Sequence, residues 1–249
     1  MGERVLSRAT GTARYRVRLA ESEEDLRAAQ TLRFLVFNLE LNEGLEESFV
    51  TCRDADPFDA VCDHLLVEDA ASREVVGTYR LQPGPRAAGA LGFYCDREFD
   101  LAPFAGRRNQ LLELGRACVH RDHRNLAVLA LLWSGIHRYA SQCGARFLMG
   151  CSSLPTTDPA MGARAYSDLM RRHLAPEDWR TVPRVDSACP LDRLHPAPVP
   201  VPKLLSAYLS LGAWLCGPPA LDREFKTVDF LTVLDLATLS PRAAKMLAG

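Results

Sequence analysis

The order of segments between residues 111 and 151 constrains the fold of this chain more than any other feature. Leu111 to Val119 is an apolar run of strand length, and Leu126 to Ser141 is a longer, mainly apolar segment that predicts a helix ending at Cys143-Gly144. Arg146 to Cys151 is a second short apolar run. A strand, a crossover helix and a strand in this order place the two strands parallel in one sheet. The chain therefore predicts a sheet that contains a parallel pair.

The segments on either side predict further strands and helices. We expect strands over residues 15–19, 62–67, 75–81 and 225–236, and helices over residues 26–37, 160–172 and 204–215. The polar stretches 40–59 and 84–89 and the proline-rich stretch 183–202 predict irregular structure. No internal repeat or break in composition divides the chain. We therefore expect one α+β domain with a single mixed sheet over residues 15–249, after a flexible N-terminus over residues 1–14.

The composition disfavours several classes of protein. A hydrophobic content of 47% is enough for a sizeable core, and a net charge of -1 disfavours a nucleic-acid-binding protein, because phosphate recognition normally needs a cationic excess. The eight cysteines form no CxxC pair or regular framework, which indicates reduced thiols in a cytosolic protein. No apolar stretch is long enough to span a bilayer, and Met1 to Arg14 has no signal-peptide core. We expect a cytoplasmic protein.

Glu113 is the sharpest candidate for chemistry because it is a carboxylate inside an apolar strand. A buried carboxylate costs free energy unless it is paired, hydrogen-bonded or used. Burial would raise its pKa towards the range of a general base, which can deprotonate an ammonium nucleophile before it attacks a thioester. The alternative is a structural ion pair with Arg116.

The segment after this strand, Arg121-Asp122-His123-Arg124-Asn125-Leu126-Ala127, leads into the apolar helix. Backbone amides at a helix N-terminus attract phosphate, and nearby arginines reinforce that attraction. The loop is therefore a candidate site for the phosphate and pantetheine arm of an acyl donor, and a solvated basic turn is the alternative. Between Arg107 and Arg146 the chain has seven arginines and two acids, which suits an acidic partner or an anionic membrane surface.

Acidic residues gather in the preceding loop. Asp54, Asp56 and Asp59 surround Phe58, and carboxylates are what a site for a cationic amine substrate needs. A solvated acidic loop is the alternative interpretation.

Three residues at the end of the strand 111–119 carry side chains that zinc prefers. Cys118, His120 and His123 offer a thiolate and two imidazoles, but structural zinc takes four ligands in tetrahedral geometry. Since a fourth ligand is missing from this pattern, the sequence predicts no metal site.

Taken together, these segments resemble the bacterial ornithine acyl-carrier-protein N-acyltransferase family, sometimes described as hemolysin-like, which has the GNAT fold. The resemblance spans roughly residues 15 to 240. The motifs that carry it are Cys62-Asp63-His64-Leu65-Leu66-Val67, Val76-Gly77-Thr78-Tyr79-Arg80-Leu81, Gly92-Phe93-Tyr94, Glu98-Phe99-Asp100-Leu101 and Glu113-Leu114-Gly115-Arg116-Ala117-Cys118-Val119, with Ala207-Tyr208-Leu209 and residues 225–236 downstream.

A more distant resemblance is to the acyl-homoserine-lactone synthase family. The residues that match its pattern are Arg33 with Phe37, Asp56 with Asp59, Arg80, and Glu113 with Arg116. Asn42-Glu43-Gly44 stands where that family has a tryptophan, which disfavours a homoserine-lactone product.

The resemblance implies a GNAT-like, mostly antiparallel sheet flanked by helices, in which the strands 111–119 and 146–151 are parallel and splay apart to receive a thioester. It implies transfer of a 3-hydroxy fatty acyl group from acyl carrier protein to the α-amino group of L-ornithine, which gives lyso-ornithine lipid. Phosphopantetheine would enter as part of the donor, with no permanently bound cofactor. N-acylation of another amino acid such as glycine, and a catalytically silent carrier-protein binding module, are the alternatives.

The resemblance also implies roles for the matching residues. Glu113 would accept the amine proton directly or through water, while Arg116 and Arg80 would fix carboxylates or the geometry of the site. Asp56 and Asp59 would hold the acceptor, together with Arg33 and Phe37. Because the product is a lipid, we expect contact with the inner membrane face, for which Leu204 to Leu215, with Tyr208 and Trp214, is a candidate; a core helix is the alternative.

Overall fold

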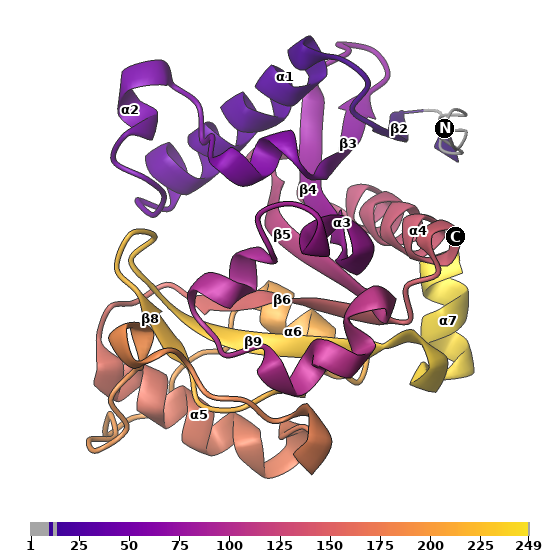
Figure 1. The fold of residues 1–249 in the computed structure, drawn as a ribbon. Helices are drawn as coiled ribbons and strands as arrows, with labels where there is room; N and C mark the ends of the chain where they lie inside the picture. The colour runs from indigo at the N-terminus through magenta and orange to yellow at the C-terminus, as the bar shows by residue number, and fades with distance from the viewer. Residues whose placement is uncertain (1–9, 12–13, 249) are drawn as a thin grey trace.

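One mixed sheet organises the computed structural model, which describes residues 10–11 and 14–248. Within these residues the sheet has nine strands, in the order β1-β2-β3-β4-β5-β6-β9-β7, and β8 pairs with β9 as well (Figure 1). All neighbours are antiparallel except β5 (Leu111–Val119) and β6 (Phe147–Leu154), which run parallel. The predicted mixed, mostly antiparallel sheet with one parallel pair is confirmed.

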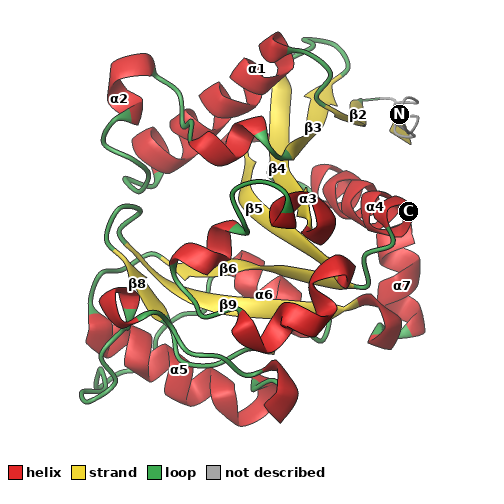
Figure 2. Ribbon diagram, viewed as in Figure 1, coloured by secondary structure: helices red, strands yellow, loops and turns green. Residues whose placement is uncertain are grey.

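Helices flank this sheet, as Figure 2 shows. The other strands are β1 (Thr10–Gly11), β2 (Tyr15–Leu19), β3 (Asp63–Asp69), β4 (Val75–Pro83), β7 (Trp214–Leu215), β8 (Ala220–Asp222) and β9 (Thr227–Asp235). The α-helices are α1 (Glu23–Arg33), α2 (Ser48–Thr51), α3 (Gly84–Ala88), α4 (Leu126–Cys143), α5 (Pro159–His173), α6 (Lys203–Ser210) and α7 (Pro241–Ala248). A π-helical stretch, Phe34–Glu40, continues α1.

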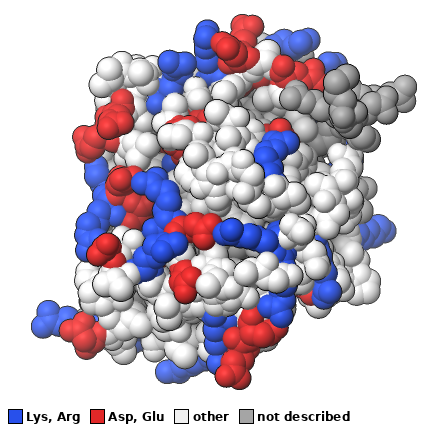
Figure 3. Space-filling view, viewed as in Figure 1, with Lys and Arg blue, Asp and Glu red and all other residues white. Residues whose placement is uncertain are grey.

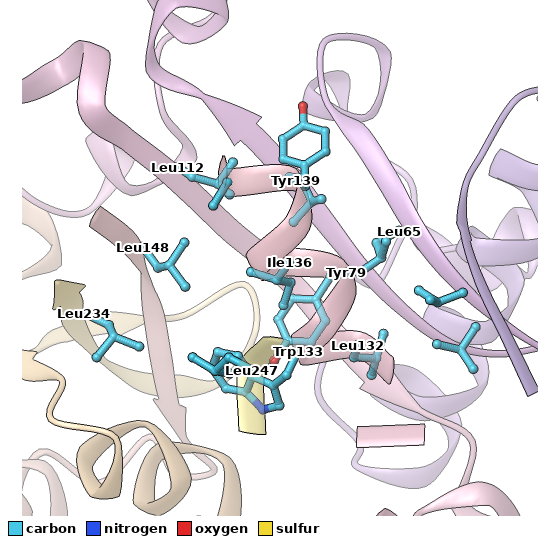
Figure 4. Close-up of a cluster of buried hydrophobic side chains, with 14 of the residues drawn as sticks. Leu65, Tyr79, Leu112, Leu132, Trp133, Ile136, Tyr139, Leu148, Leu234 and Leu247 are labelled. Carbon is cyan, nitrogen blue, oxygen red and sulfur yellow. The ribbon is translucent and has the colours of Figure 1, made fainter. Parts of the chain in front are cut away.

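The crossover helix α4 and the first helix α1 lie on opposite faces of the sheet. Val76 belongs to the cluster under α4, whereas its neighbour Val75 packs in the cluster with Leu32 and Val36 from the α1 side. Successive strand residues point to opposite faces, so each helix covers one face. The apolar side of α4 buries Leu132 and other residues against the sheet (Figure 4), and α7 packs against α4.

The parallel strands separate soon after they begin. β5 pairs with β6 only from Leu111–Phe147 to Glu113–Met149, after which β5 stays on β4 and β6 stays on β9. Gly150 lies at the point of separation, and a β-carbon added there would lie 2.4 Å from the carbonyl oxygen of Leu114. The expected splay is confirmed, and glycine permits the close approach that precedes it.

Several elements differ from the sequence prediction. The helix expected over residues 204–215 ends at Ser210, because Gly212 adopts a φ of +98° and Trp214–Leu215 pairs with β9. Residues 84–88, expected to be irregular, form α3, and α7 and β8 were not predicted. Of the N-terminus predicted to be flexible, residues 1–9 and 12–13 lie outside the described part of the chain, and Thr10–Gly11 pairs with β2.

The segment around α6 uses its aromatic side chains inside the protein. Tyr208 packs edge-on against Trp133, with ring centroids 5.4 Å apart, and its hydroxyl hydrogen-bonds that of Tyr79. Trp214 packs on Trp179. These contacts favour the core interpretation of α6. Among the described residues, no helix is long and apolar enough to cross a membrane.

Candidate active site

A cavity of about 360 Å³ opens where β5 and β6 separate. The walls of the cavity come from β4, β5, β6, β9 and α6. Three charged residues of the candidate site, Arg80, Glu113 and Arg116, line it. Among the residues that line it are Phe37, Glu43, Arg80, Tyr94, Cys95, Glu113, Arg116, Cys151, Asp222, Phe225 and Asp229. The parallel pair therefore places both a wide slot and ionisable groups in one site.

Glu113 is buried, with 4% of its surface exposed, on the face of β5 that points away from α4. Its carboxylate accepts two hydrogen bonds of 2.8 Å, from the backbone N–H groups of Tyr94 and Cys95. Burial raises the pKa of Glu113, although these two amides and the charge of Arg80 act in the opposite direction. Two backbone amides therefore fix the orientation of the Glu113 carboxylate, and burial favours its protonated form.

Arg116 owes its position to a bulge in β5. Thr78 faces Cys118 and Arg80 faces Gly115, so two residues of β5 stand opposite one residue of β4. Arg116, one of these two, adopts a φ of +50°, which costs a non-glycine residue about 1–3 kcal/mol. The bulge turns the guanidinium towards the acidic loop, and it lies 4.2 Å from the ring centroid of Phe225. Among the described residues no ion pair joins it to Glu113, so the alternative interpretation of Glu113 does not hold.

Three arginines and three aspartates form a closed, buried ion network. Its pairs are Arg33 with Asp54 (2.9 Å) and Asp59 (2.6 Å), Arg80 with Asp56 (2.7 Å) and Asp59 (3.2 Å), and Arg116 with Asp54 (3.2 Å) and Asp56 (2.8 Å). Burial acts to raise the pKa of Asp56, but the charges of Arg80 and Arg116 outweigh it and hold the pKa below its ordinary value. Each charge is thus compensated inside the protein, and the network ties α1 and the turn Pro57–Ala60 to the two site strands.

Comparison with known proteins identifies the relatives of this chain. A family model described as an acetyltransferase (GNAT) domain matches residues 32–134. The L-ornithine N(alpha)-acyltransferase of Rhodobacter capsulatus is 37% identical over 240 residues, covering 92% of this chain and 92% of the relative. The protein of the same name from Brucella abortus is 37% identical and covers 91% of this chain and 86% of the relative. The chain belongs to the L-ornithine N(alpha)-acyltransferase family.

Solved structures similar to this member of the L-ornithine N(alpha)-acyltransferase family support the fold. FeeM, an N-acyl amino acid synthase from uncultured soil microbes, matches with a TM-score of 0.58 and 13% identity, covering 94% of this chain and 99% of that one. The AHL synthase LasI matches with a TM-score of 0.52 and 13% identity, covering 93% and 95%. At such low identity the likeness establishes a shared fold.

The residues predicted for the acceptor in this family member fall into two groups. Phe37 and Arg80 line the cavity, and Phe37 packs edge-on against Phe225 at the rim. Arg33, Asp56 and Asp59 stand behind them in the ion network and are not among the lining residues. The fold brings Arg33, Arg80, Asp56 and Asp59 together, but the two carboxylates pair with arginines of the protein.

The residues predicted for the donor lie together at the N-terminus of α4. Asn125 caps the helix by accepting hydrogen bonds from the amides of Ala127 and Val128, and Arg124 pairs with Glu40 at 2.6 Å. Arg121 is exposed beside them, as is Leu126. None of these residues lines the cavity.

The arginine-rich stretch is less cationic than its sequence indicates. Arg107 pairs with Asp178, Arg108 with Asp96 and Arg146 with Asp235, while Arg116 is buried. Basic and acidic side chains lie next to one another in several places on the face seen in Figure 3. Three of these arginines therefore already have acidic partners within the protein.

The motifs in the sequence do not reveal a second set of acids. Asp222 and Asp229 from β8 and β9, and Glu43 after the π-helical stretch, line the cavity, with Glu98 directly behind. Asp229 stands between Val228 and Phe230 in a buried strand, which is the same signal that singled out Glu113. A search for carboxylates inside apolar strands, made on β9 as well as on β5, would have identified Asp229.

Proposed function

We propose that this protein is an N-acyltransferase that transfers a 3-hydroxy fatty acyl group from acyl carrier protein to the α-amino group of L-ornithine, giving lyso-ornithine lipid. The observation that carries the proposal is a buried carboxylate, Glu113, whose pKa is raised by burial and which lines the cavity where β5 and β6 separate. The names of the relatives, whose alignments cover more than nine-tenths of this chain, support ornithine as the acceptor.

The chemistry follows from the position of Glu113. It takes a proton from the α-ammonium, directly or through one water, and the free amine attacks the thioester carbonyl carbon. The carbon–sulfur bond then breaks, the pantetheine thiolate leaves and takes up a proton, and an amide remains. The bulge at Arg116 sets one residue outside the ladder, so a backbone N–H there can donate to the developing oxyanion.

The donor enters from the α4 side. The pantetheine arm lies between β5 and β6, where Leu114, Leu148 and Trp133 give the slot an apolar wall. Its phosphate reaches the N-terminus of α4, near Arg121, Arg124, Asn125, Leu126 and Ala127, where it competes with the Asn125 cap for the first amides. The carrier protein docks on the adjacent surface, and the protein needs no cofactor of its own.

The acceptor lies at the polar end of the cavity. Arg80 and Arg116 face it and attract the carboxylate of the amino acid, while Arg33, Asp56 and Asp59 hold these two arginines in place. Phe37 closes the rim. We place the reaction in the cytoplasm, in peripheral contact with the inner membrane face, because the product is a lipid.

An assay of the purified full-length protein tests the proposal. The protein is incubated with 3-hydroxyacyl carrier protein and a panel of amino acids that includes ornithine and glycine, and products are identified by mass spectrometry. We expect an amide of ornithine in excess of all others. A dominant product with glycine or another amine would reassign the acceptor. Failure to acylate any amine, together with tight binding of the carrier protein, would favour a silent binding module.

A further inference from the structure

One end of the cavity gathers carboxylates that the proposed proton transfer does not use. Asp229 of β9, Asp222 of β8 and Glu43 line the cavity there. Glu98 stands behind them, and carboxylate oxygens of Glu98 and Asp229 and the sulfur of Cys151 all lie within 4.8 Å of one another. This acidic pocket comes from four separate stretches of the chain, so only the tertiary fold assembles it.

The acidic pocket differs from the ion network in one respect, its lack of cations. Every aspartate of the network pairs with an arginine at 3.2 Å or less. In the described part of the chain, none of the four carboxylates of the acidic pocket forms a salt bridge. Like charges brought together in a low-dielectric site repel one another, and a partner of opposite charge relieves that repulsion.

Asp229 is hydrogen-bonded to Ser153 and to its neighbour Glu98, but one of its carboxylate oxygens still lacks a partner within the described part of the chain. It is 96% buried, its exposed fraction being 4%, and its Oδ1 atom has no hydrogen-bond partner among the described residues. Buried polar atoms are nearly always hydrogen-bonded, so an orphaned carboxylate oxygen at a cavity wall marks a place for a ligand donor. Burial and the charge of Asp222 raise the pKa of Asp229 to about 6, and burial and Asp229 raise that of Glu43 to about 7.

Cys95 and Cys151 connect the acidic pocket to Glu113. Cys95 donates its backbone N–H to Glu113, and its sulfur lies 3.4 Å from that of Cys151, which in turn lies 3.7 Å from a carboxylate oxygen of Glu98. Along β6, Met149 pairs with Glu113 and Ser153 pairs with Asp229, a separation of about 13 Å between backbone positions. An amino acid whose α-nitrogen reaches Glu113 can thus extend a short chain to the acidic pocket.

We infer that Asp229 and Asp222, with Glu98 held against Asp229, bind the side-chain ammonium of the acceptor and thereby select a diamino acid over amino acids with neutral side chains. This inference rests on the proposed function and adds the residues that set its specificity. An ammonium fits because it offers three donors to several acceptors, and ornithine places one three methylene groups beyond its α-carbon. Glu43 at the rim adds negative charge for the approaching cation.

The test compares ornithine with norvaline, which has the same carbon chain and α-amino group but no side-chain ammonium. Wild type, Asp229→Asn and Glu98→Gln are each given both amines in competition with 3-hydroxyacyl carrier protein, and the ratio of the two amides is measured. We expect the ornithine preference to fall by about 30-fold or more in Asp229→Asn, as for loss of one partner of a buried charge pair. The fall should be smaller but measurable in Glu98→Gln, because burial and the charge of Asp229 raise the pKa of Glu98 well above its ordinary value. Asp235→Asn is the matched control, since it makes the same change on β9 at a residue that pairs with Arg146, and its ratio should equal that of wild type.

A binding measurement separates failure of this inference from failure of the proposed function. Calorimetry should show ornithine binding to the wild-type protein more tightly than norvaline, and Asp229→Asn should abolish the difference even if no amide forms. The melting temperature of ligand-free Asp229→Asn should be at least that of wild type, because the variant loses an uncompensated buried charge. An unchanged ratio and unchanged binding in the Asp229 and Glu98 variants would overturn the inference. A metal site would replace the inference under two conditions: Zn²⁺ alone stabilises the wild-type protein but not Asp229→Asn, and the protein does not discriminate between the two amines.

Discussion

At the scale of single residues, Glu113 and Asp229 show how the same signal leads to two environments. Each is a carboxylate within an apolar strand, and each is raised in pKa by burial. Glu113 accepts two backbone hydrogen bonds at 2.8 Å, which hold it in one orientation. Asp229 keeps an oxygen atom without a partner. The first environment suits a group that must return to the same place after each proton transfer, and the second suits a group that binds and releases a ligand.

Replacing Glu113 tests the proton-accepting role. In Glu113→Gln, we expect kcat to fall by about 100-fold or more, the range typical of general-base catalysis. The amide keeps the shape of the side chain but turns one donor towards the N–H of Tyr94 or Cys95, so stability should drop by only about 1 kcal/mol. Single-turnover kinetics with saturating donor, alongside a denaturant titration, measure both quantities. A variant that turns over at the wild-type rate would remove Glu113 from the proton transfer.

The pKa of Asp229 gives a prediction with a definite sign. An acid whose pKa rises from 3.8 to about 6 on folding binds more protons in the folded state between these values, so its contribution to stability is present below pH 3.8 and is lost as pH rises towards 6. The stability difference between Asp229→Asn and wild type should therefore widen in favour of the variant from pH 4 to pH 7. Glu98, Asp222, Glu43 and Cys151 lie around Asp229. Removing the charge of Asp229 also lowers the raised pKa of Glu98 and Glu43, which widens the difference in the same direction. A difference that is flat across this range would contradict the assignment.

At the scale of elements, the splay of β5 and β6 depends on how closely their backbones approach before they separate. A methyl group on Gly150 would lie 2.4 Å from the carbonyl oxygen of Leu114, so Gly150→Ala must push the strands apart or shift the ladder. We expect a loss of about 1–3 kcal/mol in the free energy of unfolding, as for overpacking in protein cores. Activity should fall by a larger proportion, because Glu113 pairs with Met149, the residue next to Gly150. Gly106→Ala is the control, since an added methyl there meets nothing within 4 Å. Equal effects of the two substitutions would argue against a constraint at the splay.

At the scale of the whole molecule, the ion network joins segments that are far apart in the sequence. Arg33 from α1 is fully buried and binds both Asp54 and Asp59, so its replacement leaves two buried carboxylates with less compensation. Arg33→Met should therefore cost about 3–5 kcal/mol, measured by chemical denaturation. Arg27→Met on the same helix breaks only an exposed pair with Glu23 and should cost less than about 1 kcal/mol. Comparable losses in the two variants would mean that the network does not stabilise the fold.

The sequence alone determined the features that depend on local spacing. The strand–helix–strand order predicted the parallel pair, because a crossover helix allows few other arrangements, and β5 begins and ends where the apolar run does. The carboxylate in that run identified Glu113, because burial of a charge is costly wherever the strand packs. The predicted end of the helix at residue 215 was wrong, because Trp214–Leu215 finds a partner in β9 that no local pattern reveals.

Only the tertiary structure decided which acids are compensated and which face the cavity. Asp56 and Asp59 looked available for a cationic substrate, yet three arginines from distant elements surround the acidic loop and pair with its aspartates. Asp229 looked like part of an ordinary strand, yet the splay of β5 and β6 opens a cavity beside it. The physical reason is that the cost of a buried charge depends on what else lies within a few ångströms, and contacts between distant segments are set by the packing of the whole chain.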